Sequence, residues 1–161
     1  NFITNIGTEW ANKIATTTWK VGGNTGENIQ DAVPATAYQN EIVNPDNATE
    51  YPAKIGLMYA SDYGFAADPS AWTTTLYAYD RSVNGSTIRS LNWMCMGDFE
   101  WTISQMSNRA YYVFYVAASG FVSYQGSYAS RTDVVRPSFN LVASTTYASG
   151  DGTASSPIRI G

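Results

Sequence analysis

Histidine is absent from this chain of 161 residues, and cysteine occurs once, at Cys95. Without histidine there are no Ser-His-Asp or Cys-His catalytic arrangements, no histidine-based metal sites, and the commonest general base is missing. A single cysteine excludes an intrachain disulfide. Cys95 lies in the apolar run 93–96 and is expected to be a small buried hydrophobe. We therefore expect no enzymatic activity.

Charge is also scarce: charged residues make up 14% of the chain, against about 25% in an ordinary soluble domain. Nine basic residues are scattered among thirteen acidic ones, for a net charge of −4. A nucleic-acid binder needs a basic footprint, and an anionic membrane surface attracts one, so neither partner is expected. No apolar run approaches the length of a transmembrane helix, so we expect no membrane insertion within this segment.

The acidic residues do not form an evident catalytic or metal-binding site. Asp98 and Glu100 are the closest suggestive pair, but strand alternation sets the neighbouring aromatic residues on the opposite face, and we interpret the pair as a solvated polar face. The Asn44-Pro45-Asp46 tripeptide superficially resembles the sugar-selecting tripeptide of calcium-dependent lectins, but it lies too early and has no Trp-Asn-Asp partner. No spacing matches a calcium loop. We expect no metal and no cofactor.

What the chain has instead is aromatic and small polar residues. Aromatics reach 14%, and twelve of them are tyrosines. Tyrosine, threonine and tryptophan suit a half-buried pleated sheet, a composition typical of β-rich secreted and surface proteins. The length fits one domain that can bury a core without a metal or disulfide. Because the chain begins at Asn1 rather than Met, we expect a processed product or an excised domain.

Periodicity and turn signals predict the secondary structure. In the N-terminal part, residues 1–53, we expect a helix over 1–19, a strand over 16–21, and an irregular excursion over 24–52 with a short helix near 35–42. In the β-rich part, residues 54–161, we expect a strand over 54–60, a turn at 61–64, a short helix opening at 68–70, and a turn at 84–85. Further strands are expected at 92–96, 100–104, 111–117, 120–124 and 134–142, with a tail that turns at 150–153 into 157–160. The segments 101–104, 111–117, 120–124 and 134–142 are predicted to be neighbouring antiparallel strands.

Three pieces of sequence are familiar together: 54–66; Trp101-Thr102-Ile103-Ser104 with the later 120–122; and 134–141 with 150–160. The last contains a V-R-P-x-x-x-L pattern followed by G-D-G-T-x-x-x-P-x-x-I. This resembles the outer domains of bacterial surface proteins, some with prepilin-type N-terminal segments. The order of the motifs is also similar to the C-type-lectin fold of the formylglycine-generating-enzyme type, which carries the variable domains of diversity-generating retroelements.

The resemblance implies an α+β, C-type-lectin-like fold, with one or two helices packed on a twisted, mostly antiparallel sheet with long loops. It also implies that Trp101 is a buried scaffold residue. Formylglycine-generating enzymes use a pair of active-site cysteines, and this chain has only Cys95, so that activity is not implied.

The segment 107–133 is the candidate binding region. Its tyrosines, serines, asparagine and arginines offer large rigid contacts and adaptable hydrogen bonding, as antibody paratopes do. The alternative is that this pattern is ordinary sheet surface. Its apolar residues, Val113, Phe114, Val116, Phe121 and Val122, are expected to be partly core. The candidate ligand-binding residues are Ser107, Asn108, Arg109, Tyr111, Tyr115, Ser123, Gln125, Ser127, Tyr128 and Arg131.

These observations favour an extracellular, non-catalytic ligand-recognition domain of a bacterial cell surface or a virion. Its ligand is expected to be a surface glycan or a protein. The alternative is a structural subunit of a surface filament or fibre, pilin-like or tail-fibre-like, whose surfaces meet copies of itself. The third hypothesis, an unusual enzyme, is the least supported.

Overall fold

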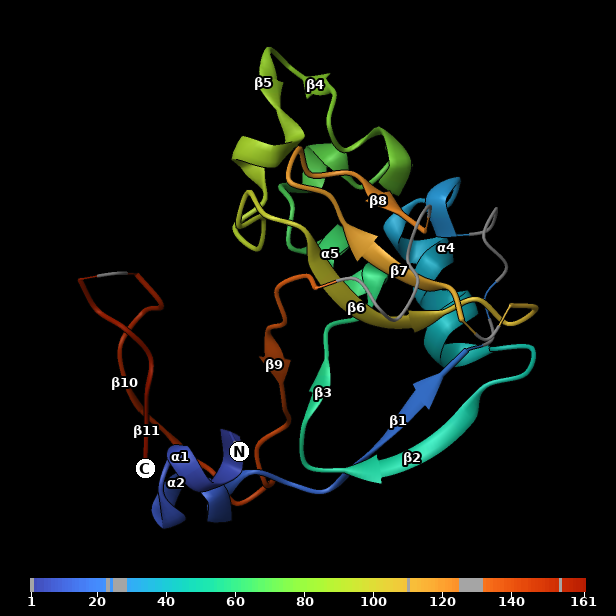
Figure 1. The fold of residues 1–161 in the computed structure, drawn as a ribbon. Helices are drawn as coiled ribbons and strands as arrows, with labels where there is room; N and C mark the ends of the chain where they lie inside the picture. The colour runs from blue at the N-terminus through green and yellow to red at the C-terminus, as the bar shows by residue number, and fades with distance from the viewer. Residues whose placement is uncertain (1, 23, 25–28, 110, 125–131, 154) are drawn as a thin grey trace.

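The computed structural model describes residues 2–22, 24, 29–109, 111–124, 132–153 and 155–161 (Figure 1). The N-terminal third consists of short elements. They are α1 (Phe2–Asn5), α2 (Thr8–Lys13), β1 (Thr17–Val21), α4 (Pro34–Tyr38), the π-helical turn η1 (Gln39–Val43) and β2 (Thr49–Ala53). Pro34 opens α4, where its fixed φ suits the first turn and its missing N–H costs nothing.

The middle of the chain is a run of short turns after one further helix. These elements are β3 (Gly56–Leu57), α5 (Ala60–Phe65), the 3-10 turns η2 (Pro69–Ala71) and η3 (Leu76–Ala78), the hairpin β4 (Ser82–Val83) and β5 (Ser86–Thr87), and η4 (Ile88–Leu91). The expected turn at 84–85 is confirmed: Asn84 and Gly85 both have positive φ, as a tight hairpin turn requires. The expected helix opening at 68–70 is also confirmed, with Asp68 accepting a hydrogen bond from the Ser70 amide.

The last third holds the largest sheet, three antiparallel strands in the order β6 (Glu100–Gln105), β7 (Val113–Val116) and β8 (Val122–Ser123). These are the strands predicted at 100–104, 111–117 and 120–124. Burial alternates along β6: Glu100, Thr102 and Ser104 are buried, and the residues between them are half-buried. Trp101 is one of the latter, so the expectation that it is fully buried is wrong.

The main core lies on the inner face of this sheet. Phe114, Val116 and Val122 from β7 and β8 meet Tyr63 of α5 and Tyr79, which follows η3. Both tyrosines are fully buried, and each hydroxyl donates to a backbone carbonyl, Tyr63 to Gly120 at 2.7 Å and Tyr79 to Gly64 at 3.1 Å. A buried phenol needs such a partner. As expected, Val113 and Phe121 are partly buried. Cys95 is half-buried against this cluster, so the expectation that it is buried is wrong.

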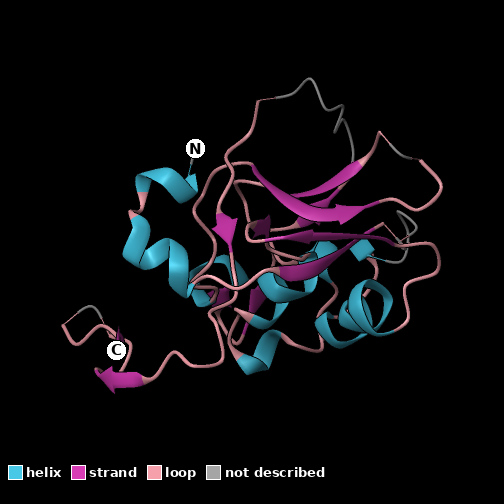
Figure 2. Cartoon of the chain, turned by 90° about the horizontal axis from the view of Figure 1, so that it is seen from below, coloured by secondary structure: helices cyan, strands magenta, loops and turns pink. Residues whose placement is uncertain are grey.

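The remaining sheets are two-stranded and antiparallel: β1 with β2, β3 with β9 (Pro137–Ser138), β4 with β5, and β10 (Tyr147–Ser149) with β11 (Arg159–Ile160). Figure 2 shows how few residues of the chain lie in regular elements. The architecture is a mixed α+β fold with a few short helices and several small antiparallel sheets.

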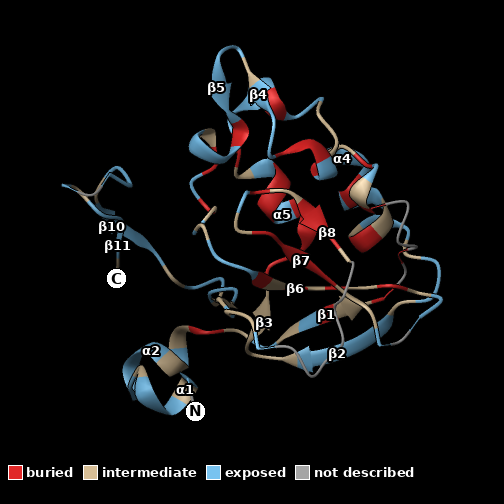
Figure 3. Cartoon of the chain, turned by 45° about the horizontal axis from the view of Figure 1, so that its top comes forward, coloured by how far each residue is buried: buried red, intermediate tan, exposed pale blue. Residues whose placement is uncertain are grey.

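The two ends of the chain form a peripheral lobe, made of α1, α2, β10 and β11. No described residue of α1 or α2 is buried, and β10 is exposed throughout (Figure 3). Two contacts join the N-terminal and C-terminal segments. Ile14 and Leu141 form an antiparallel β-bridge, and the Lys13 ammonium donates a 2.6 Å hydrogen bond to the Gly161 carbonyl. Within the described ranges, no helix has both the length and the apolar character needed to cross a membrane.

Several predicted elements are wrong because contacts from elsewhere in the chain override local pattern. The helix predicted over 1–19 is interrupted at Gly7, which has φ +84°, and ends at Lys13. The strand predicted over 54–60 is limited to 56–57, and α5 replaces the turn predicted at 61–64. A helix starts there because the Asp62 carboxylate accepts from the Tyr59 amide at 2.9 Å and a distant residue, Glu41, accepts from the next two amides.

Two further predicted strands are also corrected. Residues 92–96 form no strand, because Asn92 bonds locally to the Met94 amide at 3.0 Å and its side-chain amide donates to the Tyr63 carbonyl. The strand predicted over 134–142 is reduced to β9, which pairs with β3. Only Val134 bridges β6, and it does so in parallel, so this segment is not an antiparallel neighbour of the central sheet.

Gly56 offers a test of how β1 and β3 pack. A Cβ added at Gly56 would come within 2.6 Å of the Trp19 ring, far inside van der Waals contact. We expect Gly56→Ala to displace that indole and to lower the free energy of unfolding by about 1–3 kcal/mol, measured by urea denaturation. The indole N–H resonance of Trp19, which donates to the Ala53 carbonyl, should shift at the same time. An unshifted indole resonance would contradict the packing described here.

Candidate functional site

A cluster of aromatic rings and one guanidinium lies at the end of the central sheet, between β6 and β7 and just after β8. We call it the tyrosine–arginine cluster; its members are Arg109, Tyr111, Tyr112 and Tyr124. The ring centroids of Tyr111 and Tyr112 are 5.0 Å apart, and those of Tyr112 and Tyr124 are 6.2 Å apart. The Arg109 guanidinium carbon lies 5.5 Å from the centroid of the Tyr112 ring, within the range of a cation–π contact.

The cluster has a fixed base and an accessible tip. Tyr112 and Tyr124 are half-buried and pack against the main core, where the Tyr124 ring meets Phe114 at 6.0 Å. Arg109 is exposed, and Tyr111 keeps 59% of its surface accessible. Because the base is held by the core, the tip presents its contacts from a rigid support.

The loop that carries the cluster is held by backbone hydrogen bonds. The Tyr112 amide donates to the Arg109 carbonyl at 2.9 Å, and the Met106 amide donates to the Tyr112 carbonyl at 3.1 Å. Asn24, from a distant part of the chain, accepts from the Ser107 amide. The side chains at the tip are therefore placed by a backbone that is bonded to its surroundings.

The predicted ligand-binding residues fall into three groups. Asn108, Arg109 and Tyr111 are exposed and adjacent, and Ser107 is half-buried beside them. Tyr115 and Ser123 are 6% and 4% exposed, so the expectation that they contribute to an exposed face is wrong. The remaining predicted residues, Gln125, Ser127, Tyr128 and Arg131, lie outside the described residues.

Tyr115 is buried because of its place in the sheet. It lies on the middle strand opposite Trp101, and the rings of Phe99 and Trp101 approach it at 5.7 and 6.3 Å. Ser123 pairs with Tyr115 and shares its burial. Tyr112 and Tyr124, by contrast, join the site although sequence reasoning did not single them out. Their only signal was membership of the tyrosine-rich segment.

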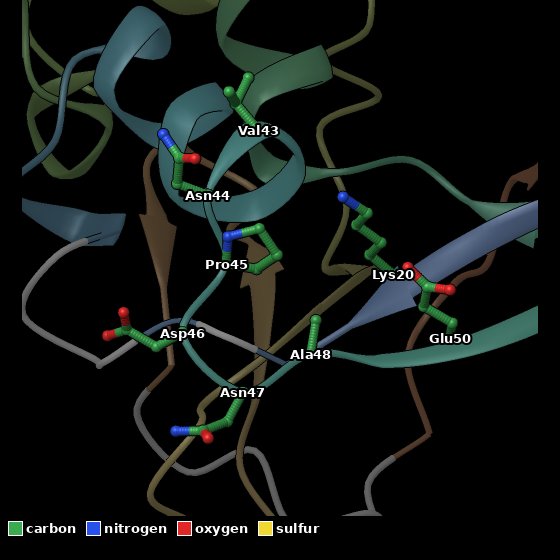
Figure 4. A pocket seen from close by; sticks show the side chains of 8 residues that line it. All are labelled: Lys20, Val43, Asn44, Pro45, Asp46, Asn47, Ala48 and Glu50. Atoms are coloured by element: carbon green, nitrogen blue, oxygen red, sulfur yellow. The ribbon is translucent and has the colours of Figure 1, made fainter.

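A second feature is an open polar hollow between β1, η1 and β2 (Figure 4). Its volume is about 570 Å³, and its walls include the tripeptide Asn44-Pro45-Asp46. The Lys20 ammonium at its edge donates to the Ile42 carbonyl at 2.7 Å. The residues that line this hollow include no aromatic side chain, so it offers hydrogen bonds without a flat apolar face. The tyrosine–arginine cluster offers both.

The carboxylates Asp98 and Glu100 do not form a site together. Asp98 is exposed, whereas Glu100 is 1% exposed, so the interpretation of both as a solvated face is wrong for Glu100. Its carboxylate pairs with Arg136 at 2.9 Å, and the same guanidinium donates to the Met94 carbonyl at 2.6 Å. Burial raises the pKa of Glu100, and the neighbouring Arg136 opposes that rise.

Glu41 is a buried carboxylate that nothing in the sequence marks. It accepts hydrogen bonds from the amides of Ala60 at 3.1 Å and Ser61 at 3.0 Å, and from the Ser104 hydroxyl. Burial raises the pKa of Glu41 to about 7, although these donors act in the opposite direction. With 1% of its surface exposed and both oxygens bonded internally, Glu41 acts within the fold and does not meet a ligand.

In the part of the chain that the structure describes, no three His, Cys, Asp or Glu side chains are grouped to hold a metal ion. Comparison with known proteins identifies no relative: the chain matches no protein-family model, no curated protein and no solved structure.

Glu41 should make stability depend on pH. Its pKa rises from 4.5 in the unfolded chain to about 7 in the fold, so the folded state prefers the protonated form. The stabilisation from this preference is complete below pH 4.5 and is lost as pH rises through 7. At pH 8 the loss is on the order of 3 kcal/mol.

Glu41→Gln removes the charge and keeps the size of the side chain, but its amide nitrogen cannot accept a hydrogen bond as the second carboxylate oxygen does. We therefore expect a loss of stability at pH 4 and a shift of the difference in favour of the variant by pH 8, by urea denaturation at both values. A difference between the two proteins that stays constant with pH would contradict the raised pKa.

The Glu100–Arg136 pair supports a second stability test. Arg136→Met leaves the buried Glu100 carboxylate without its cation, so we expect a loss of about 2 kcal/mol or more, moderated by the 26% exposure of the arginine side chain. The double variant Glu100→Gln, Arg136→Met should recover part of that loss, because it removes the unpaired charge. Equal stability of the single and double variants would show that the charge is not the cause.

Proposed function

We propose that this chain is a non-catalytic ligand-recognition domain, of the adhesin or receptor-binding kind, that acts on a bacterial cell surface or virion. The tyrosine–arginine cluster is its contact surface, and its ligand is a surface glycan or a protein. One observation carries this proposal: an exposed tyrosine and an exposed arginine both contact Tyr112, which packs against the core together with Tyr124.

The chemistry of the cluster suits recognition. Tyrosine supplies a large contact area and a hydroxyl while ordering only two side-chain torsions. A guanidinium held near an aromatic face loses less freedom when it binds, which reduces the entropic cost of association. Tyrosine and arginine are also enriched among residues whose truncation costs most binding energy. A flat aromatic face with adjacent donors fits a sugar ring or a protein loop.

A C-type-lectin-like fold belongs to the same proposal. It is supported by the resemblance of the motifs at 101–104, 120–122 and 134–141. The antiparallel order β6–β7–β8 and the long irregular connections around it are compatible with that fold. The position of the cluster in the loop after β6 agrees with binding by loops that a rigid scaffold supports.

The proposal is tested by truncating the tip of the cluster. Ligands are first sought on glycan arrays and on intact cells. Tyr111→Ala and Arg109→Ala should each weaken binding at least tenfold, as is common for such residues at an interface centre. Melting temperatures should stay within about 2 °C of wild type, because surface substitutions away from the core change stability little.

Tyr51→Ala is the matched control. Tyr51 is similarly exposed but lies on β2, away from the cluster. If Tyr51→Ala weakens binding as much as Tyr111→Ala does, or if both cluster variants keep wild-type affinity, the contact surface is elsewhere.

The structural-subunit alternative has its own supporting observation. Short helices and an isolated two-stranded hairpin are marginal in water, yet the peripheral lobe consists of both and exposes Trp10, Tyr147 and Ile158. Its charged residues, Glu9, Lys13, Asp151 and Arg159, balance each other on a protein of net charge −4. Exposed apolar side chains with balanced charges around them suit contact between copies. Concentration-dependent sedimentation that Trp10→Ser abolishes would favour this second function over the first.

A further inference from the structure

A third concave feature lies where β1, η1, the start of α5 and the end of β9 converge. It is a cavity of about 290 Å³. Three of its walls are aromatic, formed by Trp19, Tyr59 and Phe139, and Asp62 is the only charged residue among those that line it. The other lining residues are Ile42, Ser138 and Asn140. None of these belongs to the tyrosine–arginine cluster, so the inference below does not depend on the proposed function.

The aromatic walls are fixed before any ligand arrives. The rings of Trp19 and Tyr59 stack with centroids 6.3 Å apart and an interplanar angle of 29°. Trp19 packs on Gly56, and its indole N–H donates to the Ala53 carbonyl at 3.1 Å. The Tyr59 hydroxyl accepts from the Lys20 amide and donates to the Lys20 carbonyl, at 2.8 and 3.0 Å. The polar atoms of both rings are therefore already bonded, and because Trp19 and Tyr59 are only 7% and 8% exposed, the cavity meets a small part of each ring.

The polar side chains in the lining are the Asp62 carboxylate, the Asn140 amide and the Ser138 hydroxyl. One Asp62 oxygen accepts from the Tyr59 amide at 2.9 Å, and no described residue donates to the other. The side-chain nitrogen of Asn140 donates to the Thr17 hydroxyl at 3.1 Å, which leaves the side-chain oxygen of Asn140 for a ligand. Among the described residues no lysine or arginine lines the cavity, and the Lys20 ammonium is bonded to the carbonyl of the lining residue Ile42 at 2.7 Å. An anion needs a cation from its site, so it fits poorly here.

We propose that this cavity binds an alkylammonium ion. Aromatic rings attract a cation through their quadrupole, and the Asp62 carboxylate in the lining supplies the opposite charge. The absence of basic residues from the lining removes the competing charge. A free quaternary amine and a methylated ammonium on a partner's side chain share this chemistry, and the experiment separates the two sources.

The test is a titration of the ¹⁵N-labelled full chain with choline, followed by NMR. We expect saturable binding with a Kd of about 1 mM or tighter, and shifts centred on the Trp19 indole N–H and on the amides of Tyr59, Asp62 and Asn140. The neutral alcohol 3,3-dimethyl-1-butanol has nearly the same shape as choline without its charge. It should bind at least tenfold more weakly.

Asp62→Asn is the decisive variant. Asparagine keeps an oxygen that can accept from the Tyr59 amide but removes the charge, so affinity for choline should fall at least tenfold. Asp68→Asn is the matched control, because Asp68 also accepts a backbone amide at a helix start but does not line the cavity. It should leave the affinity unchanged. Phe139→Leu removes one aromatic wall and should weaken choline binding severalfold, which tests the site even if Asp62→Asn fails to fold.

A peptide carrying trimethyllysine provides the second arm. If it binds as choline does, the source is a partner's side chain as well as a free amine; if only choline binds, the site takes free ions. The proposal is overturned if the alcohol binds as tightly as choline, if Asp62→Asn and Phe139→Leu both keep wild-type affinity, or if the shifts map to the tyrosine–arginine cluster.

Discussion

The buried carboxylate of Glu41 holds together the parts of this structure on which the others depend. It joins three segments that are distant in sequence: η1, the first amides of α5, and Ser104 on β6. Helix α5 is only six residues long and could not persist alone in water. With its first turn bonded to Glu41, it carries Tyr63 into the core beneath the central sheet. Removing these bonds would leave buried amides without acceptors, which is costly.

Both candidate sites are built on this frame. Tyr59 immediately precedes the two amides that donate to Glu41, so its ring reaches the cavity lined by Trp19, Tyr59 and Phe139 from the same helix start. On the other side, Tyr63 and Phe114 belong to one cluster, and Tyr112 and Tyr124 pack against it. The tip of the tyrosine–arginine cluster is thereby held at a fixed place on the surface. A small fold with few long elements can present rigid contacts because its aromatic side chains interlock.

The titratable groups are used for structure. Glu41 and Glu100 are buried and bonded to internal partners, with raised pKa values. A buried carboxylate is often a sign of an active site, but here its oxygens face backbone amides, a hydroxyl or an arginine. Asp62 differs, since it is reachable and lines a cavity with three aromatic rings. Asp62 can therefore contact a ligand, whereas the buried Glu41 and Glu100 cannot.

Composition and local pattern were enough to predict several features. The α+β class, the strand at 17–21, the hairpin 111–124 and the Asn84-Gly85 turn all depend on contacts between residues close in sequence, or on side chains that suit a sheet. The abundance of tyrosine in the segment 107–133 is visible in the sequence, although which of these tyrosines are exposed could not be predicted. The alternation of faces along a strand did not distinguish Tyr111 from Tyr115. Tyr115 is buried because the rings of Phe99 and Trp101 cover it.

Only the tertiary structure decided the rest. The helix at 60–65 forms in place of a predicted turn because a residue nineteen positions earlier supplies its acceptor, and β9 pairs with β3 instead of joining the central sheet. The aromatic cavity draws its lining from four separate elements, so no sequence window contains it. The sequence by itself determined what kinds of contact this protein can make, through its tyrosines and its lack of histidine. Where those contacts lie was decided by long-range hydrogen bonds and ring packing, because these join residues whose separation along the chain carries no periodic signal.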